Sequence, residues 1–208
     1  MEGSAKLAIP RHANGTFMGI ITIDFEASCL PQRGPSYPIE VGIAGDGGSS
    51  AWLIQPHASW LGWQWSDEAE RLHGITLGQL QSEGKPVEVV ANDLHRALAG
   101  HRVVADSPFD NYWMQALAVA AGTSFPAPIA HISVIFDELK TTAEEIAVAQ
   151  ISIGNSKMHK HRARYDAIWL RALIGEVTKA ASHRLPAETS ARYGRNVPIL
   201  PNGECQWL

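Results

Sequence analysis

The chain has 208 residues, of which 45% are hydrophobic and 18% charged, and its formal net charge is −4. This length and composition describe a globular protein with room for one full core, and they exclude a membrane span, because no apolar run reaches the roughly 20 residues that a span requires. The negative charge argues mildly against a nucleic-acid-binding protein, whose surface is more often basic.

The N-terminal part of the chain predicts three strands joined by short links. A buried strand is expected at 17–25, where most residues are apolar, and a second at 37–44, where apolar residues alternate. Glycines at 45–48 are typical of a hairpin turn, because glycine tolerates positive φ, and a third strand is expected at 50–55. Together these strands predict a meander.

The rest of the chain predicts alternating helices and strands. Acidic residues after Ser66 indicate the start of a capped helix, and apolar residues at helical spacing indicate an amphipathic helix at 87–99. This order predicts an α/β fold with a mixed sheet and helices packed on it. The further predicted elements are a strand at 102–105, a helix at 110–121, a strand at 129–136 (with a helix starting at Ser133 as the alternative) and a helix at 163–181.

Three segments differ in character along the chain. We expect a flexible leader at 1–16, a domain at 17–183 and an irregular tail at 184–208, where prolines and glycines occur without periodicity. Cys29 and Cys205 form no disulfide framework, and the polar N-terminus has no apolar signal core. The sequence therefore predicts a cytoplasmic protein.

Asp24 and Glu26 lie two residues apart at the end of the first predicted strand. Side chains in a strand alternate between faces, so these two carboxylates project from the same face. Like charges so placed resist ionisation unless a cation lies between them, and all-oxygen ligands favour Mg²⁺ or Mn²⁺. The alternative is that Asp24 is only a turn residue or a helix cap.

Two further carboxylates are candidates for the same site. Asp110 follows the strand at 102–105 and opens a helix, where the alternative role is an N-cap, and Asp106 competes with it four residues earlier. Asp166 lies on the apolar stripe of the last helix, where an ionised carboxylate is costly unless it is paired or bound to a metal. Arg162 and Arg164 share that stripe poorly, so we favour the metal.

His161 precedes Asp166 by five residues, where a loop enters the last helix. An imidazole at this place could take a proton from water, because histidine exchanges protons near neutral pH. A solvated histidine in a basic loop is the alternative, and His159 lies only two residues away.

In this order and spacing the motifs resemble those of the DEDDh 3′→5′ exonucleases. This DnaQ-like group includes the proofreading subunit of DNA polymerase III and ribonuclease T. The first motif matches at 23–28, the second at 103–110 and the third at 161–167, with supporting matches at 38–42 and 72–76. The resemblance covers roughly 17–180.

The resemblance implies a ribonuclease H-like fold with a five-stranded mixed sheet, flanking helices and an antiparallel second strand. It also implies hydrolysis of 3′-terminal phosphodiester bonds of DNA or RNA with two Mg²⁺ or Mn²⁺ ions, releasing nucleoside monophosphates. The implied partner is nucleic acid with a free 3′ end, expected to be single-stranded, and a homodimer is possible. Implied site residues are Asp24, Glu26, Asp110 and Asp166 as metal ligands, His161 as general base, and Phe25, His73 and Ile75 as substrate contacts.

One departure separates the chain from this family pattern. The second motif of the family reads His-Asn-x-x-Phe-Asp, whereas this chain has Ala105 and Asp106 in place of His-Asn. The change removes an amide and adds a negative charge, and we interpret it as a subgroup difference. The alternative function is a non-catalytic nucleic-acid- or protein-binding module on the same fold, for which the loss of a ligand position would be expected.

Three tryptophans, Trp60, Trp63 and Trp65, lie between the third strand and the motif at 72–76. They could stack on nucleotide bases or pack their loop onto the sheet, and we expect packing, with at most one ring exposed.

Overall fold

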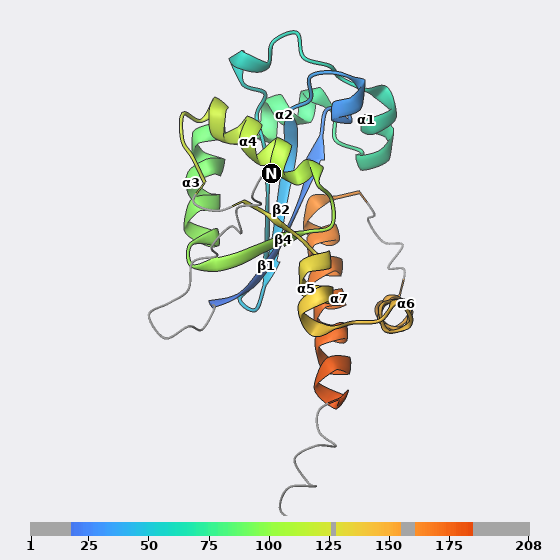
Figure 1. Ribbon diagram of the computed structural model, residues 1–208. Helices are drawn as coiled ribbons and strands as arrows, with labels where there is room; N and C mark the ends of the chain where they lie inside the picture. The colour runs from blue at the N-terminus through green and yellow to red at the C-terminus, as the bar shows by residue number, and fades with distance from the viewer. Residues whose placement is uncertain (1–17, 126–127, 155–160, 185–208) are drawn as a thin grey trace, which may run out of the picture.

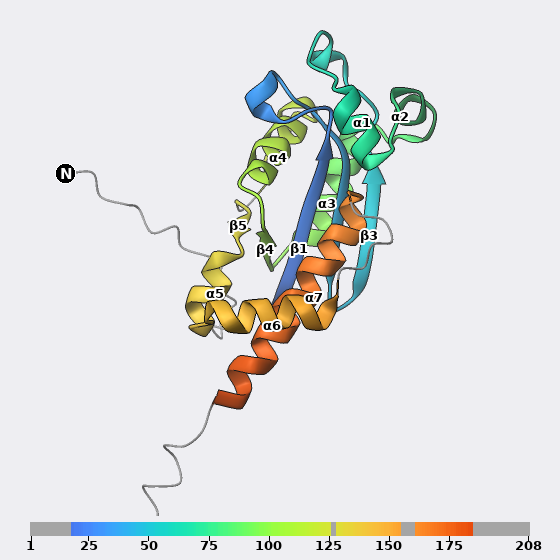
Figure 2. The ribbon, with the colours of Figure 1, turned by 90° about the vertical axis from the view of Figure 1, so that its right-hand side faces the viewer.

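The computed structural model describes residues 18–125, 128–154 and 161–184. In these residues a five-stranded sheet is flanked by helices on both faces (Figures 1 and 2). The strand order across the sheet is β3-β2-β1-β4-β5. The elements are β1 (Met18–Ala27), a 3-10 helix (Pro31–Arg33), β2 (Pro38–Gly45), β3 (Gly48–Leu53), a 3-10 helix (Ala58–Trp60), α1 (Asp67–His73), α2 (Leu77–Glu83), α3 (Val87–Leu98), β4 (His101–Ala105), α4 (Phe109–Ala120), β5 (Ala130–His131), α5 (Ser133–Leu139), α6 (Ala143–Ile153) and α7 (Ala163–Arg184).

The central strand β1 joins an antiparallel part of the sheet to a parallel part. It pairs antiparallel with β2, which pairs antiparallel with β3, and it pairs parallel with β4 on its other side. The predicted α/β class, the meander, the mixed sheet and the antiparallel second strand are therefore confirmed.

Strand β1 divides its side chains between two apolar cores. Ile21, Ile23 and Phe25 face the larger core, to which α3 and α4 contribute. Alternation places Thr22 and Asp24 on the opposite face, which α7 covers (Figure 2). Because α7 packs across β1 and β2, its N-terminal residues lie near the end of β1.

The predicted strand at 129–136 is wrong over most of its length. Only Ala130–His131 is a strand, and α5 starts at Ser133, as the alternative held. The apolar residues that predicted a strand lie on one side of a helical turn instead. Ile132 and Ile135 both pack against apolar residues of α7 in the second core. The sequence also did not predict α2 or α6, although each begins at a threonine N-cap.

Several predictions fall outside the described residues, namely the leader at 1–16, nearly all of the tail at 184–208, and Cys205. The domain boundaries therefore stay predictions. Cys29 is buried and free. Among the helices of the described ranges, none is both long and apolar enough to cross a membrane.

Candidate metal centre

Carboxylates from β1 and α7 converge where β1 ends. Asp24 and Glu26 project from the same face of β1, as predicted, and Asp166 reaches them from the first turn of α7. One oxygen of each residue lies within 4.8 Å of one oxygen of the other two. The structure therefore brings together residues 140 positions apart in the chain.

A second group of carboxylates shares Asp24 with the first. Asp106, which follows β4, and Asp110, in the first turn of α4, each place an oxygen within 4.8 Å of Asp24 and of each other. Asp110 is not the N-cap of its helix, because Pro108 holds that position. Instead, Asp110 Oδ1 accepts a hydrogen bond of 3.2 Å from the backbone N–H of Phe25.

Asp106 is the residue of this cluster that the sequence analysis did not assign to the site. From the motif, Asp106 was only the residue that replaces the asparagine of the family pattern and a carboxylate that competes with Asp110. The signal that could have identified it is its place directly after a parallel strand next to β1, since open α/β sheets bind ligands at the carboxyl ends of their strands.

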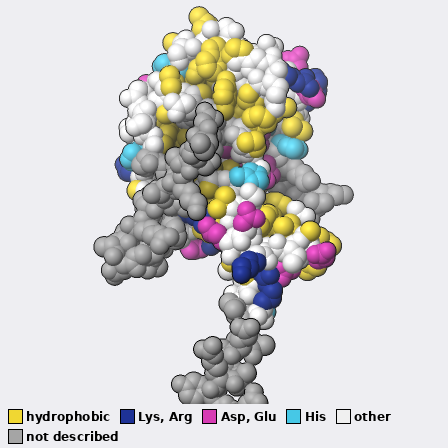
Figure 3. Space-filling view, in the orientation of Figure 1, with side chains coloured by type: hydrophobic (Ala, Val, Ile, Leu, Met, Phe, Trp, Pro, Cys, Tyr) yellow, Lys and Arg dark blue, Asp and Glu magenta, His cyan; other side chains and the backbone are white. Residues whose placement is uncertain are grey.

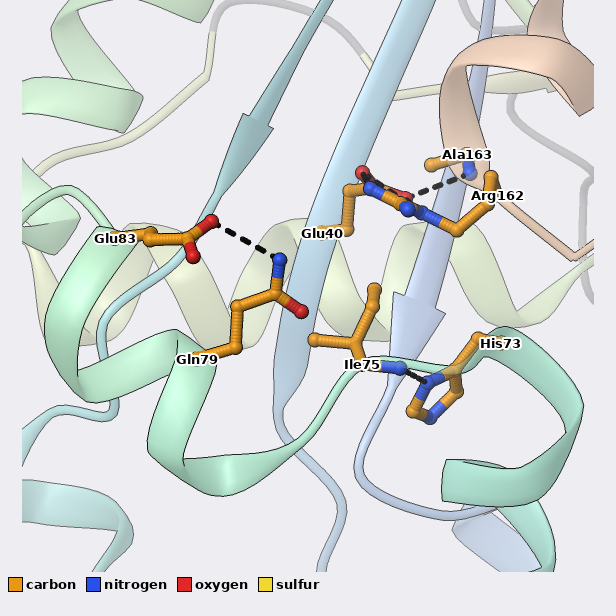
Figure 4. A network of polar contacts seen from close by, with 7 residues as sticks. All are labelled: Glu40, His73, Ile75, Gln79, Glu83, Arg162 and Ala163. Carbon is orange, nitrogen blue, oxygen red and sulfur yellow. Dashed lines mark hydrogen bonds and ion pairs between the residues drawn. The ribbon is translucent and has the colours of Figure 1, made fainter.

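The N-terminus of α7 is anchored to the sheet on the same side. Thr22 Oγ1 donates a 2.7 Å hydrogen bond to the carbonyl of Ala167. One strand away, the buried carboxylate of Glu40 accepts from Arg162 Nη2 at 2.6 Å and from the backbone N–H of Ala163 at 3.0 Å. Figure 4 shows Glu40 pointing from β2 into the start of α7. These contacts set the position from which Asp166 reaches the other carboxylates.

His161 lies just before α7, with φ at 65°, in the left-handed region that non-glycine residues rarely adopt. Its backbone N–H donates a 3.0 Å hydrogen bond to Asp166 Oδ2, which holds the backbone of His161 against the cluster. Burial raises the pKa of Asp166, and this hydrogen bond and the charge of the His161 side chain oppose that rise. His159 lies outside the described residues.

Burial and mutual repulsion dominate the electrostatics of the cluster. Burial, and then the charge of Asp110, raise the pKa of Asp24 well above its ordinary value. Burial and Asp166 raise the pKa of Glu26 to about 8, and burial and Asp106 raise that of Asp110 to about 8. Without a cation, the cluster therefore retains protons at neutral pH.

The residues present fit divalent cations. The donors are all carboxylate oxygens, the ligands that Mg²⁺ and Mn²⁺ prefer. Asp110 Oδ2 is buried and has no hydrogen-bond partner among the described residues. A buried acceptor without a partner is costly, and a bound cation would satisfy it.

A cleft of about 170 Å³ opens beside Glu26. Of the predicted substrate contacts, Phe25 and His73 line it, whereas Ile75 is fully buried and donates its backbone N–H to His73 Nδ1 at 3.0 Å (Figure 4). Burial lowers the pKa of His73 to about 4, so its imidazole is neutral at pH 7. The Nδ1 atom accepts this bond, which leaves the Nε2 hydrogen available as a donor. The other lining residues include Ala27, Cys29, Leu30, Arg33, Leu72 and Trp113.

The three tryptophans pack their loop onto the fold, as predicted. Trp60 is buried and stacks on Tyr37 with ring centroids 5.3 Å apart, and Trp65 Nε1 donates to Glu70. Trp63 packs at the edge of the larger core.

In the view of Figure 3 hydrophobic side chains gather over the upper half of the face, the part that contains α1 and α4.

No protein-family model matches the sequence, and no curated protein is similar to it in sequence. Solved structures match its fold. A 3′-exonuclease studied for 3′-end specific recognition of a histone mRNA stem-loop matches with a TM-score of 0.59 and 15% identity, over 78% of this chain and 64% of that one. E. coli exonuclease I in complex with a dA16 oligonucleotide matches with a TM-score of 0.57 and 12% identity, over 79% of this chain and 41% of that one. Pop2p of S. pombe, in a form with Mg²⁺ and Mn²⁺ bound, matches with a TM-score of 0.53 and 14% identity, over 77% of this chain and 82% of that one.

The likeness establishes the fold. The five-stranded mixed sheet with flanking helices is the ribonuclease H-like fold of these exonucleases, as the resemblance of the sequence motifs implied. The chain spans less than half the length of E. coli exonuclease I and 64% of the histone mRNA exonuclease.

Proposed function

We propose that this chain is a metal-dependent 3′→5′ exonuclease of the DEDDh type, which hydrolyses the 3′-terminal phosphodiester bond of DNA or RNA. One observation carries the proposal: two clusters of three carboxylates have Asp24 in common. Within each cluster, one oxygen of every residue lies within 4.8 Å of one oxygen of the other two. Two divalent cations held side by side are the usual requirement of phosphodiester hydrolysis on such a site.

Each residue has a separate part in the proposed reaction. Asp24, Glu26, Asp110 and Asp166 would hold the cations, and Asp24 is the residue that the two clusters have in common. Bound Mg²⁺ or Mn²⁺ would lower the pKa of a coordinated water and neutralise charge on the scissile phosphate. His161 accepts the proton of the attacking water from its position at the start of α7.

The 3′-terminal nucleoside is proposed to occupy the cleft beside Glu26. Phe25 forms part of its apolar wall, and the neutral imidazole of His73 offers its Nε2 hydrogen to the substrate. Ile75 acts indirectly, because its backbone N–H orients the His73 ring. A single strand suits a cleft of this size, whereas the choice between DNA and RNA depends on contacts to the 2′-OH. The cytoplasmic location and a homodimer stay predictions.

The test is a digest of oligonucleotides by the wild type and by Asp24→Asn, with Mg²⁺ or Mn²⁺ present. Single-stranded DNA, single-stranded RNA and duplexes with 3′ overhangs are compared, each labelled at the 3′ end or the 5′ end. We expect immediate release of the 3′ label as a mononucleotide and a shrinking ladder from the 5′ label. Asp24→Asn should lower the rate by several orders of magnitude, because it removes the shared ligand.

The control is Asp137→Asn, an exposed aspartate of α5, which should retain the wild-type rate. Undiminished activity in Asp24→Asn would contradict the assignment of the site. A wild-type protein that is inert on all three substrates with Mn²⁺ would favour the non-catalytic binding module.

A further inference from the structure

Asp106 stands where the DEDDh pattern has an asparagine, and the fold turns this difference into a fifth carboxylate at the metal centre. Its carboxylate oxygen lies within 4.8 Å of ligand oxygens of Asp24 and Asp110. Two oxygens bound to one cation at about 2.0–2.6 Å are separated by about 3–5 Å, so the three carboxylates can bind a common ion.

A second observation points to a cation at this place. Asp110 is 1% exposed, and its Oδ2 has no hydrogen-bond partner among the described residues, while Oδ1 is satisfied by the backbone of Phe25. The ion pairs found between described residues all involve other carboxylates, including Glu40 with Arg162. Asp24, Asp106 and Asp110 therefore have no ion-pair partner in the part of the chain that the structure describes.

The backbone that carries Asp106 is held in place from β5. His131 Nε2 lies 3.0 Å from the carbonyl oxygen of Asp106, and His131 Nδ1 accepts the backbone N–H of Ser133 at 3.2 Å. Both contacts are satisfied by one tautomer, with the proton on Nε2. The link ties the segment between β4 and α4 to β5.

We propose that Asp106 binds a divalent cation directly, together with Asp24 and Asp110, so that one of the two metal positions has three carboxylate ligands. A carboxylate at this position provides a charged oxygen ligand that an asparagine does not. The cation position that Asp106 serves should therefore bind Mn²⁺ more tightly than the same position with an amide. The role of this ion in cleavage rests on the proposed function, but its binding does not.

The test measures Mn²⁺ binding to the full chain without nucleic acid, by calorimetric titration and by the electron paramagnetic resonance signal of free Mn²⁺. The wild type should take up two ions. Asp106→Asn keeps the shape of the side chain and removes its charge. It should lower the affinity for one Mn²⁺ ion by about tenfold or more and leave the affinity for the other within about twofold of the wild type. Asp137→Asn is the matched control and should bind as the wild type does.

A further variant, Asp106→Glu, separates ligation from general electrostatics. It keeps the charge and moves the oxygens by one methylene group. Direct ligation therefore predicts weaker Mn²⁺ binding, whereas a charge effect alone predicts unchanged Mn²⁺ binding. Thermal unfolding of the metal-free variants checks that each is folded.

The proposal would be overturned if Asp106→Asn bound two ions with wild-type affinity, if the wild type bound fewer than two, or if Asp106→Glu bound as the wild type does. These outcomes are distinct from a failure of the proposed function. A protein that loses one Mn²⁺ on Asp106→Asn and yet cleaves no nucleic acid would support the metal position and contradict the exonuclease.

Discussion

At the scale of single residues, a carboxylate next to the metal centre, Glu40, is paired with an arginine instead of facing the other carboxylates alone. Glu40 pairs with Glu26 in the register of β1 and β2, so the two side chains leave the same face of the sheet. Glu40 is nevertheless occupied by Arg162 and by the backbone of Ala163. The charge of Glu40 still raises the pKa of Glu26, and Arg162 offsets this effect in part while it ties the start of α7 to β2.

We expect Arg162→Gln to lower the free energy of unfolding by about 2 kcal/mol, because the buried Glu40 carboxylate loses its guanidinium partner. The value is below that of a fully buried pair because the Arg162 side chain is 36% exposed to water. Denaturant unfolding of the metal-free protein measures the change. The double variant Glu40→Gln/Arg162→Gln should recover part of the loss, and strictly additive effects would contradict this account.

At the scale of elements, the close packing of α7 on β2 is what brings Asp166 to the end of β1. A methyl group at Gly42 would lie 2.2–2.3 Å from backbone atoms of Ala163 and Arg164, a separation that backbone atoms cannot accommodate without moving. Only a residue without a side chain allows this approach. Gly42 lies opposite Asp24 in the sheet, so the contact is directly beside the site.

Gly42→Ala should therefore lower the free energy of unfolding by about 1–3 kcal/mol and weaken Mn²⁺ binding, because the start of α7 must shift away from the sheet. Gly47→Ala is the matched control, since a methyl group there meets nothing within 4 Å. Thermal unfolding and calorimetric titration with Mn²⁺ measure the two effects. Equal behaviour of the two variants would show that the helix start is not held by this contact.

The predicted elements were most accurate where periodicity was long. The amphipathic helix at 87–99 is α3, and the last helix begins at Ala163 as predicted. The run at 129–136 was too short to separate a strand from a helix, because both bury its apolar residues. Tertiary packing against α7 decided that α5 forms there.

At the scale of the whole molecule, the raised pKa values of the carboxylates make the stability of the metal-free protein depend on pH. Glu26 and Asp110 titrate near 8 when folded and near their ordinary values of 4.5 and 3.8 when unfolded. The folded state therefore binds more protons between these limits, and stability falls as pH rises toward 8. His73 acts in the opposite direction only between about pH 4 and pH 6.5, because its pKa is about 4 when folded and 6.5 when unfolded.

We expect the Tm in the presence of a chelator to decrease between pH 6.5 and pH 8, the interval in which His73 no longer contributes. Glu26→Gln should reduce this decrease, because it removes one of the titrating groups. Mn²⁺ should raise the Tm more at pH 8 than at pH 6.5, since ligands must lose their protons to bind a metal. Scanning calorimetry at both pH values provides the measurement, and a Tm that rises with pH in the chelated wild type would contradict the burial of the cluster.

The sequence by itself determined the fold class and nominated four carboxylates of the cluster, because strand alternation and helical spacing are local rules that act within a few residues. Asp24 and Glu26 had to share a face, and Asp166 had to lie on the inner side of its helix. Only the tertiary structure decided that Asp106 joins them, that Glu40 is paired with Arg162, and that Ile75 is fully buried. Those outcomes depend on contacts between segments from β1 to α7 that are far apart in the chain, and no local pattern specifies which carboxylate meets a cation and which meets an arginine.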